Sequence, residues 1–182
     1  SGRDSDNLFS NRTANLTFDK KLKQKAELLL NFCRTKSIRL VTAESCTGGL
    51  VTSCLTSIPG SSDVVEGGIV TYSNNAKNLL LGVPRDLLES HGAVSEEVAR
   101  AMAEGAIVRT NASVSVAITG VAGPDGGSKE KPVGLVHFGV AGTNRITEGA
   151  HFYFHGDRQK IQLDSVEAAL DLLQKFVAEI YA

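Results

Sequence analysis

The spacing of apolar and polar residues predicts helices and strands that alternate along most of the chain. In the first periodic stretch the apolar side chains lie at helical intervals, at Phe18, Leu22, Leu29 and Cys33. Lysines fall mostly on the opposite face, so we expect an amphipathic helix there. Later helices are predicted at 50–58, 73–81, 95–106 and 157–180, with a further short one starting at Pro84.

Strands are predicted at 38–43, 64–72, 113–118, 133–140 and 146–154. The last two are separated by turn-forming residues, which is typical of an antiparallel hairpin. Helices that alternate with strands early, followed by a late hairpin, favour a three-layer α/β/α domain with a mixed sheet of about five strands. We assign residues 17–182 to this single domain and expect the polar residues 1–16 to form a disordered leader.

Composition narrows the classes of function that the chain can have. Its 182 residues suit one domain, and 42% hydrophobic with 21% charged residues is typical of a globular protein. Because the net charge is −1, no broad basic surface is available for nucleic acid or for an anionic membrane. We therefore expect any anionic ligand to be held by local groups, and the composition leaves self-association open.

Cysteine and histidine positions argue against disulfides and a shared metal site. Cys33, Cys46 and Cys54 cannot all pair and form no CxxC motif, which favours free thiols and a cytoplasmic location. His151 and His155 would lie roughly 13 Å apart on one strand, too far to share an ion. The sequence also lacks the GxxxxGK[ST] and GxGxxG patterns of common nucleotide sites. We expect neither a metal nor a cofactor.

The first candidate for chemistry is the junction between the strand at 38–43 and the following helix. The polar and glycine residues there are Ser45, Thr47, Gly48 and Gly49. Ligands bind at such strand ends, and the N–H groups of a helix start can stabilise a phosphate or an oxyanion. The simpler interpretation is that Ser45 caps the helix. Cys46 is a rival nucleophile, because a helix N-terminus would lower the pKa of its thiol.

A second candidate segment, 72–77, follows the next predicted strand. A serine hydroxyl needs a group that takes its proton, and a lysine can do so once burial lowers its pKa from about 10.4 towards neutrality. Lys77 could serve Ser45 in this way. Taken alone, Lys77 is typical of a solvated helix residue and Tyr72 of a half-buried strand aromatic, and sequence spacing cannot bring them together.

The third candidate is a glycine-rich segment that follows the strand at 113–118. Its residues of interest are Gly120, Gly123, Asp125, Gly126 and Gly127. Such a segment can turn successive N–H groups into one anion-binding concavity, although a plain surface loop is the simpler interpretation. Arg158, at the start of the last helix, could make a bidentate contact with a phosphate, while Asp157 could simply cap that helix.

Five motifs together resemble one family, in the same order along the chain. They are AESCTGG at 43–49, YSNNAK at 72–77, HGAVS at 91–95, GVAGPDGG at 120–127 and GDR at 156–158. The chain is similar to the CinA C-terminal domain family over about residues 22–178. The resemblance implies the same three-layer α/β/α fold, with a topology like that of anticodon-binding domains. We expect a stand-alone form, without the N-terminal domain of larger members.

The family includes bacterial nicotinamide-nucleotide amidohydrolases of pyridine nucleotide salvage. The resemblance therefore implies hydrolysis of nicotinamide mononucleotide (NMN) to nicotinate mononucleotide and ammonia. It makes Ser45 the nucleophile of an acyl-enzyme mechanism, Lys77 its base and Tyr72 a hydroxyl in the same network, with the glycine-rich segments lining the nucleotide site. Gln162 stands where many members carry a further arginine.

Two other functions stay open at this point. The chain could be a non-catalytic module of the same fold that binds a nucleotide or another protein. It could also be a Ser–Lys hydrolase that acts on a different small amide. Release of ammonia from NMN separates the proposed enzyme from the binding module.

Overall fold

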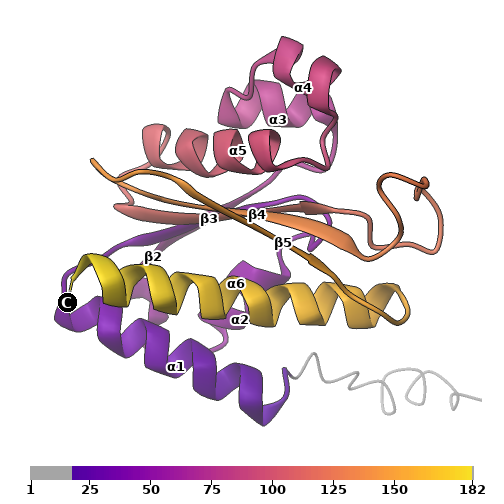
Figure 1. The fold of residues 1–182 in the computed structure, drawn as a ribbon. Helices are drawn as coiled ribbons and strands as arrows, with labels where there is room; N and C mark the ends of the chain where they lie inside the picture. The colour runs from indigo at the N-terminus through magenta and orange to yellow at the C-terminus, as the bar shows by residue number, and fades with distance from the viewer. Residues whose placement is uncertain (1–17, 182) are drawn as a thin grey trace, which may run out of the picture.

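The computed structural model describes residues 18–181 and has a five-stranded sheet between two layers of helices (Figure 1). The strands are β1 (Leu40–Glu44), β2 (Val65–Val70), β3 (Val114–Gly120), β4 (Leu135–Gly142) and β5 (Glu148–Tyr153). The helices are α1 (Lys20–Thr35), α2 (Leu50–Thr56), α3 (Asn74–Leu81), α4 (Arg85–His91), α5 (Glu96–Val108) and α6 (Arg158–Ile180), with a 3-10 turn at Ser61–Asp63. The predicted leader at 1–16 lies outside the described residues.

The sheet has the strand order β2-β1-β3-β4-β5, which confirms the predicted mixed sheet. β1 pairs in parallel with β2 and β3, whereas β4 is antiparallel to β3 and to β5. Parallel strands end at the same edge of a sheet, so the segments after β1, β2 and β3 all begin there. β5 runs in the same direction as β3 and leads into α6 at that edge as well. The candidate segments at 45–49, 72–77 and 120–127 and the start of α6 are thereby brought to one end of the molecule.

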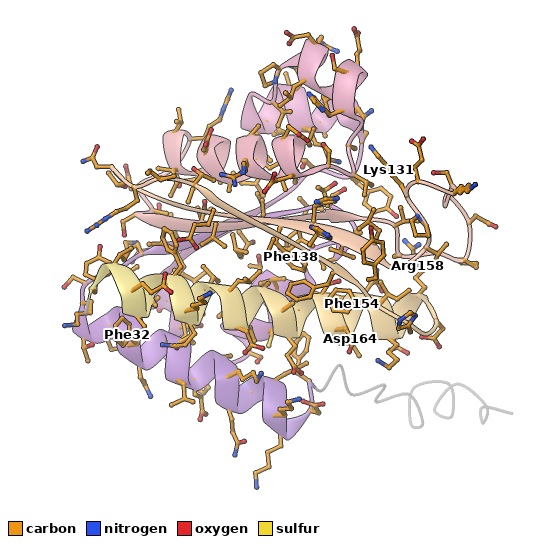
Figure 2. The ribbon with its side chains drawn as sticks, viewed as in Figure 1. Phe32, Lys131, Phe138, Phe154, Arg158 and Asp164 are labelled. Atoms are coloured by element: carbon orange, nitrogen blue, oxygen red, sulfur yellow. The ribbon has the colours of Figure 1, made fainter. Side chains whose placement is uncertain are left out.

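Helices cover both faces of the sheet: α1, α2 and α6 lie on one side, and α3, α4 and α5 on the other (Figure 1). Each side has its own apolar cluster. Val116 and Phe138 belong to the cluster on the α6 side, where Phe138 lies between the sheet and the helix (Figure 2). Val41 and Ala117 belong to the cluster under α5. The central strands are buried on both faces, as expected for a sheet between two helical layers. Among the described helices, none combines the length and apolar composition that crossing a bilayer requires.

Side-chain caps begin three helices where the sequence predicts them. Each cap accepts a hydrogen bond from the N–H of the third residue after it, and the caps are Ser73, Ser95 and Asp157. Helix α2 differs, because it begins only at Leu50, after Gly49 with a φ of 101°. The interpretation of Ser45 as the cap of this helix is therefore wrong.

Candidate active site

A cavity of about 270 Å³ opens at the sheet edge where β1, β2 and β3 end. The predicted site residues that line it are Ser45, Tyr72, Lys77, Gly120, Gly123, Asp125, Gly126 and Arg158. The predicted binding residues Thr47, Gly48, Gly49 and Gly127 are not part of this lining. Asn74, which the sequence indicated only as part of the segment 72–77, and Thr119, which it did not single out, also line the cavity.

Lys77 lies against Ser45 at the inner end of this cavity. The lysine comes from the first turn of α3 and is only 1% exposed. Its Nζ donates a hydrogen bond to Ser45 Oγ at 2.9 Å and another to the Thr71 carbonyl oxygen at 2.8 Å. The interpretation of Lys77 as a solvated helix residue is therefore wrong, because the fold buries it and pairs it with the serine.

Burial also changes the acidity of this lysine. Desolvation lowers the pKa of Lys77 from 10.5 to about 8, because the charged amine loses its contact with water. Its two hydrogen-bond partners among the described residues, a hydroxyl and a carbonyl oxygen, carry no charge that would oppose this effect. Near pH 8 a neutral Nζ is well populated, and it can accept the Ser45 proton while it still donates to Thr71.

Ser45 is fixed by its position between β1 and a tight turn. Its backbone N–H donates to the Ile118 carbonyl oxygen at 2.9 Å, which extends the pairing of β1 with β3. Its own carbonyl accepts the N–H of Gly48 at 3.0 Å. Gly48 and Gly49 have φ values of 56° and 101°, a left-handed conformation that lets the chain turn from the strand into α2. The glycines thus shape the turn, and neither of them lines the cavity.

Cys46 lines the cavity but is a poor nucleophile. Burial raises the pKa of its thiol to about 12, so the predicted lowering by a helix N-terminus is wrong. The reason is geometric, because α2 begins four positions further along, at Leu50. The Cys46 carbonyl oxygen accepts a hydrogen bond from Gln162 Nε2 at 3.0 Å, so the residue that stands in place of a further arginine ties α6 to the turn.

The start of α2 is filled by a side chain of the protein itself. Glu44 Oε1 accepts the N–H of Val51 at 2.9 Å, and Oε2 accepts the N–H of Thr52 at 3.0 Å. The hydroxyl of Thr47 donates to Oε1 at 2.7 Å. A ligand anion at this helix start, as the sequence predicted, would therefore have to displace Glu44. The signal that could have indicated this role is a glutamate at a strand end with threonines two residues before it and three and eight residues after it.

Arg158 bridges two segments at the mouth of the cavity. Its Nη2 donates to the Tyr72 hydroxyl at 2.8 Å, and its Nη1 donates to the Gly123 carbonyl oxygen at 2.7 Å. Figure 2 shows Arg158 at the end of the sheet where the loop that carries Lys131 projects. Tyr72 is 64% exposed, so the interpretation of it as a half-buried strand aromatic is wrong. The remaining N–H groups of Arg158 donate to none of the described residues and can contact a ligand anion.

Histidines and cysteines form no metal site and no disulfide in the part of the chain that the structure describes. His137 and His151 face each other across β4 and β5, with ring centroids 5.3 Å apart, a pairing that the sequence did not predict. Within residues 18–181, no three His, Cys, Asp or Glu side chains are grouped so that they could hold a metal ion. The three cysteines are buried free thiols.

Comparisons with known proteins agree on one family. The model of the CinA C-terminal domain matches residues 22–177. A CinA-like protein of Geotalea uraniireducens is 51% identical over 142 residues, which are 78% of this chain and 34% of that protein. A CinA-like protein of Anaeromyxobacter sp. is 48% identical over 148 residues, 81% of this chain and 36% of that protein. This chain thus spans about a third of the length of these relatives.

Solved structures support the same relationship. The competence/damage inducible protein CihA from Agrobacterium tumefaciens is 42% identical with a TM-score of 0.85, and the match covers 87% of this chain and 97% of that chain. A CinA superfamily protein from Escherichia coli is 35% identical with a TM-score of 0.82, and the match covers 91% of this chain and 97% of that chain. The arrangement of sheet and helices is therefore shared with proteins of known structure.

Proposed function

This chain belongs to the CinA C-terminal domain family, and on that premise we propose that it hydrolyses the carboxamide of NMN to nicotinate mononucleotide and ammonia. The observation that carries the proposal is the contact of 2.9 Å between Ser45 Oγ and the buried Nζ of Lys77. The choice of NMN as substrate rests on the five sequence motifs that resemble the amidohydrolases of the family.

The first half of the reaction is an acyl transfer to Ser45. Neutral Lys77 takes the hydroxyl proton, and Oγ attacks the carboxamide carbon to form a tetrahedral intermediate. The protonated Nζ then gives its proton to the leaving nitrogen, which departs as ammonia. The product of this half-reaction is an ester between Ser45 and the nicotinate nucleotide. Throughout, the Thr71 carbonyl holds Nζ in place by its hydrogen bond of 2.8 Å.

The second half returns the enzyme to its starting state. Lys77, neutral again after ammonia has left, accepts a proton from a water molecule that attacks the ester carbon. The proton returns to Ser45 Oγ as the ester bond breaks, and nicotinate mononucleotide leaves as an acid that gives its carboxyl proton to the released ammonia or to water. One lysine thus serves as base and as acid in both halves, which requires a pKa not far from the working pH. Its value of about 8 meets that requirement.

Recognition of the phosphate is assigned to Arg158 and the glycine-rich segment. A net charge of −1 supplies no general attraction for a phosphomonoester, so local groups must provide it. The N-terminus of α2 is filled by Glu44. The guanidinium of Arg158, next to Gly123 and Gly126 on the cavity wall, has N–H donors left for a phosphate.

Ammonia release from three related amides tests the proposal. Purified protein is assayed with NMN, with nicotinamide riboside and with free nicotinamide. We expect turnover of NMN to be fastest, Ser45→Ala to abolish it, and Ser57→Ala, which loses only a bond to the Cys54 carbonyl, to retain it. Ammonia from none of the three would overturn the proposal and favour a binding module. Ammonia from other amides but not from NMN would favour a Ser–Lys hydrolase with a different substrate.

A further inference from the structure

Glu44 is the residue next to Ser45 and is completely buried. It is the last residue of β1, and its carbonyl oxygen accepts the N–H of Thr71 at 2.8 Å. Thr71 in turn accepts the hydrogen bond from Lys77 Nζ through its own carbonyl. The backbone of Glu44 is thus connected to both members of the Ser45–Lys77 pair, through the peptide bond on one side and through Thr71 on the other.

The side chain of Glu44 makes a second set of contacts with the turn and with α2. In addition to the N–H groups of Val51 and Thr52 and the Thr47 hydroxyl, Oε2 lies 2.8 Å from Thr52 Oγ1 and 3.1 Å from Thr42 Oγ1. The two threonine Oγ1 atoms are 2.5 Å apart. Two hydroxyl protons therefore serve three close oxygen–oxygen contacts, two of them with Glu44 Oε2 and one between the threonines. Backbone N–H groups and hydroxyls supply all of these contacts among the described residues.

Other contacts hold the two ends of the turn at Ser45–Gly49. At its start, the Ser45 N–H bonds to the Ile118 carbonyl and Gln162 bonds to the Cys46 carbonyl. Where the turn enters α2, backbone bonds run from Gly48 to Ser45, from Leu50 to Thr47 and from Ser53 to Gly49, and the Glu44 carboxyl group adds the side-chain contacts. If the carboxyl group of Glu44 were lost, the buried N–H of Val51 would lose its partner. The end of the turn that leads into α2 would then lose its side-chain anchor, and a misplacement of about 1 Å at a catalytic group can cost about a hundredfold in rate.

The neighbouring strand β2 leaves space for the threonines that contact Glu44. Gly68 of β2 pairs with Thr42 of β1. A Cβ atom at Gly68 would lie 2.1 Å from Thr52 Oγ1 and 2.8 Å from Thr42 Oγ1. Because Gly68 has no side chain, the hydroxyls of Thr42 and Thr52 can approach the β2 backbone and each other beside Glu44.

From these contacts we propose that Glu44 is a positioning residue, whose carboxyl group anchors the turn at Ser45–Gly49 and so holds Ser45 Oγ against Lys77. The proposal rests on the proposed function only in taking Ser45 as the nucleophile. It does not depend on which amide is the substrate. Glu44 itself does not line the cavity and acts through its neighbour.

The test measures the reactivity of Ser45 directly, with a fluorophosphonate that reacts with activated serines. The second-order rate of labelling at Ser45 is followed by mass spectrometry from pH 6 to pH 10 in the full chain. We expect Glu44→Gln and Thr47→Val to lower this rate at least tenfold and to weaken its rise near pH 8. Thr47→Ser keeps the hydroxyl and is expected to stay within threefold of the parent.

Thr56→Val is the matched control on the same helix. Its hydroxyl bonds only to the carbonyl oxygens of Thr52 and Ser53 and is remote from the carboxyl group, so labelling should stay within twofold of the parent. Circular dichroism and thermal melts establish that each variant is folded at the assay temperature. If Glu44→Gln does not fold, Thr47→Val, which removes a single hydroxyl contact, decides the question.

Two outcomes would overturn the positioning role. Folded Glu44 and Thr47 variants that label at the parental rate with the same pH profile would show that the cluster only stabilises the fold. A parent chain whose Ser45 does not label would show that no activated serine is held there. By contrast, a parent that labels at Ser45 but releases no ammonia from NMN would overturn the proposed substrate alone, and the variants would still decide the role of Glu44.

Discussion

Replacing Lys77 with methionine separates the cost of burying an amine from its use in catalysis. The pKa of Lys77 falls from 10.5 in water to about 8 in the fold. At 1.36 kcal/mol per pKa unit, the protonated amine costs the folded state about 3 kcal/mol. Methionine has a similar volume and no charge, but it leaves the Thr71 carbonyl without its donor, at a cost of about 1–2 kcal/mol. We therefore expect Lys77→Met to be inactive and about 1–2 kcal/mol more stable at pH 7.

The difference in the free energy of unfolding between Lys77→Met and the parent changes with pH in a direction that the lowered pKa of Lys77 determines. Below pH 8 the amine is protonated in both states, and the full cost of burial applies. Between pH 8 and 10.5 the unfolded chain still binds the proton that the folded chain has released, so the parent gains stability relative to the variant as pH rises. Above pH 10.5 both states are neutral and the cost is gone.

Urea titrations at several values between pH 7 and 10.5, followed by circular dichroism, measure this difference. The exposed Lys129 provides the control, because Lys129→Met removes a lysine amine that the fold leaves in contact with water. We expect the advantage of Lys77→Met to shrink by about 3 kcal/mol across the window. Parallel curves for Lys77→Met and the parent, with a change below about 1 kcal/mol, would refute the inference that the buried amine has a lowered pKa.

Three further substitutions test other parts of the account. Cys46→Ala should reduce ammonia release from NMN less than threefold, and a complete loss in a folded protein would make the cysteine the nucleophile. Arg158→Ala should lower kcat/KM for NMN by ten- to a hundredfold, since a charge-assisted hydrogen bond contributes about 1.5–3 kcal/mol, and should change the rate with nicotinamide riboside little. An equal loss on both substrates would assign Arg158 to the fold. Gly105→Ala should destabilise the fold by about 1–3 kcal/mol in urea titrations, because the new Cβ would meet the Leu81 carbonyl oxygen, and an unchanged midpoint would contradict that clash.

Local rules predicted the elements of this fold because the signals that mark them are themselves local. Ser95 followed by two glutamates marks the start of α5, and Ser73 marks the start of α3, since a cap involves residues only three positions apart. The three-layer fold with a mixed sheet then follows from the order of the elements. The strand order and the pairing of β1 with both β2 and β3 needed the structure, because periodicity does not determine which strands are neighbours.

Local rules do not predict which residues of the candidate site contact one another. Ser45 and Lys77 are 32 positions apart and meet because β1 and β2 are adjacent parallel strands that end at the same edge. The prediction for Cys46 failed because the chain makes a turn before α2 begins and the thiol is buried instead. Glu44 was missed because the threonines spaced around it are identified as partners of its carboxyl group only once the fold places them beside it.

Ser45, activated by Lys77, is proposed to cleave the carboxamide of NMN. The most direct measurement is ammonia and nicotinate mononucleotide released from NMN by the parent and by Ser45→Ala, side by side at pH 8. We expect equal amounts of the two products from the parent and none above the buffer background from the variant. A parent that releases no more ammonia than buffer, or a Ser45→Ala variant that keeps more than a tenth of the parental rate, would contradict the claim.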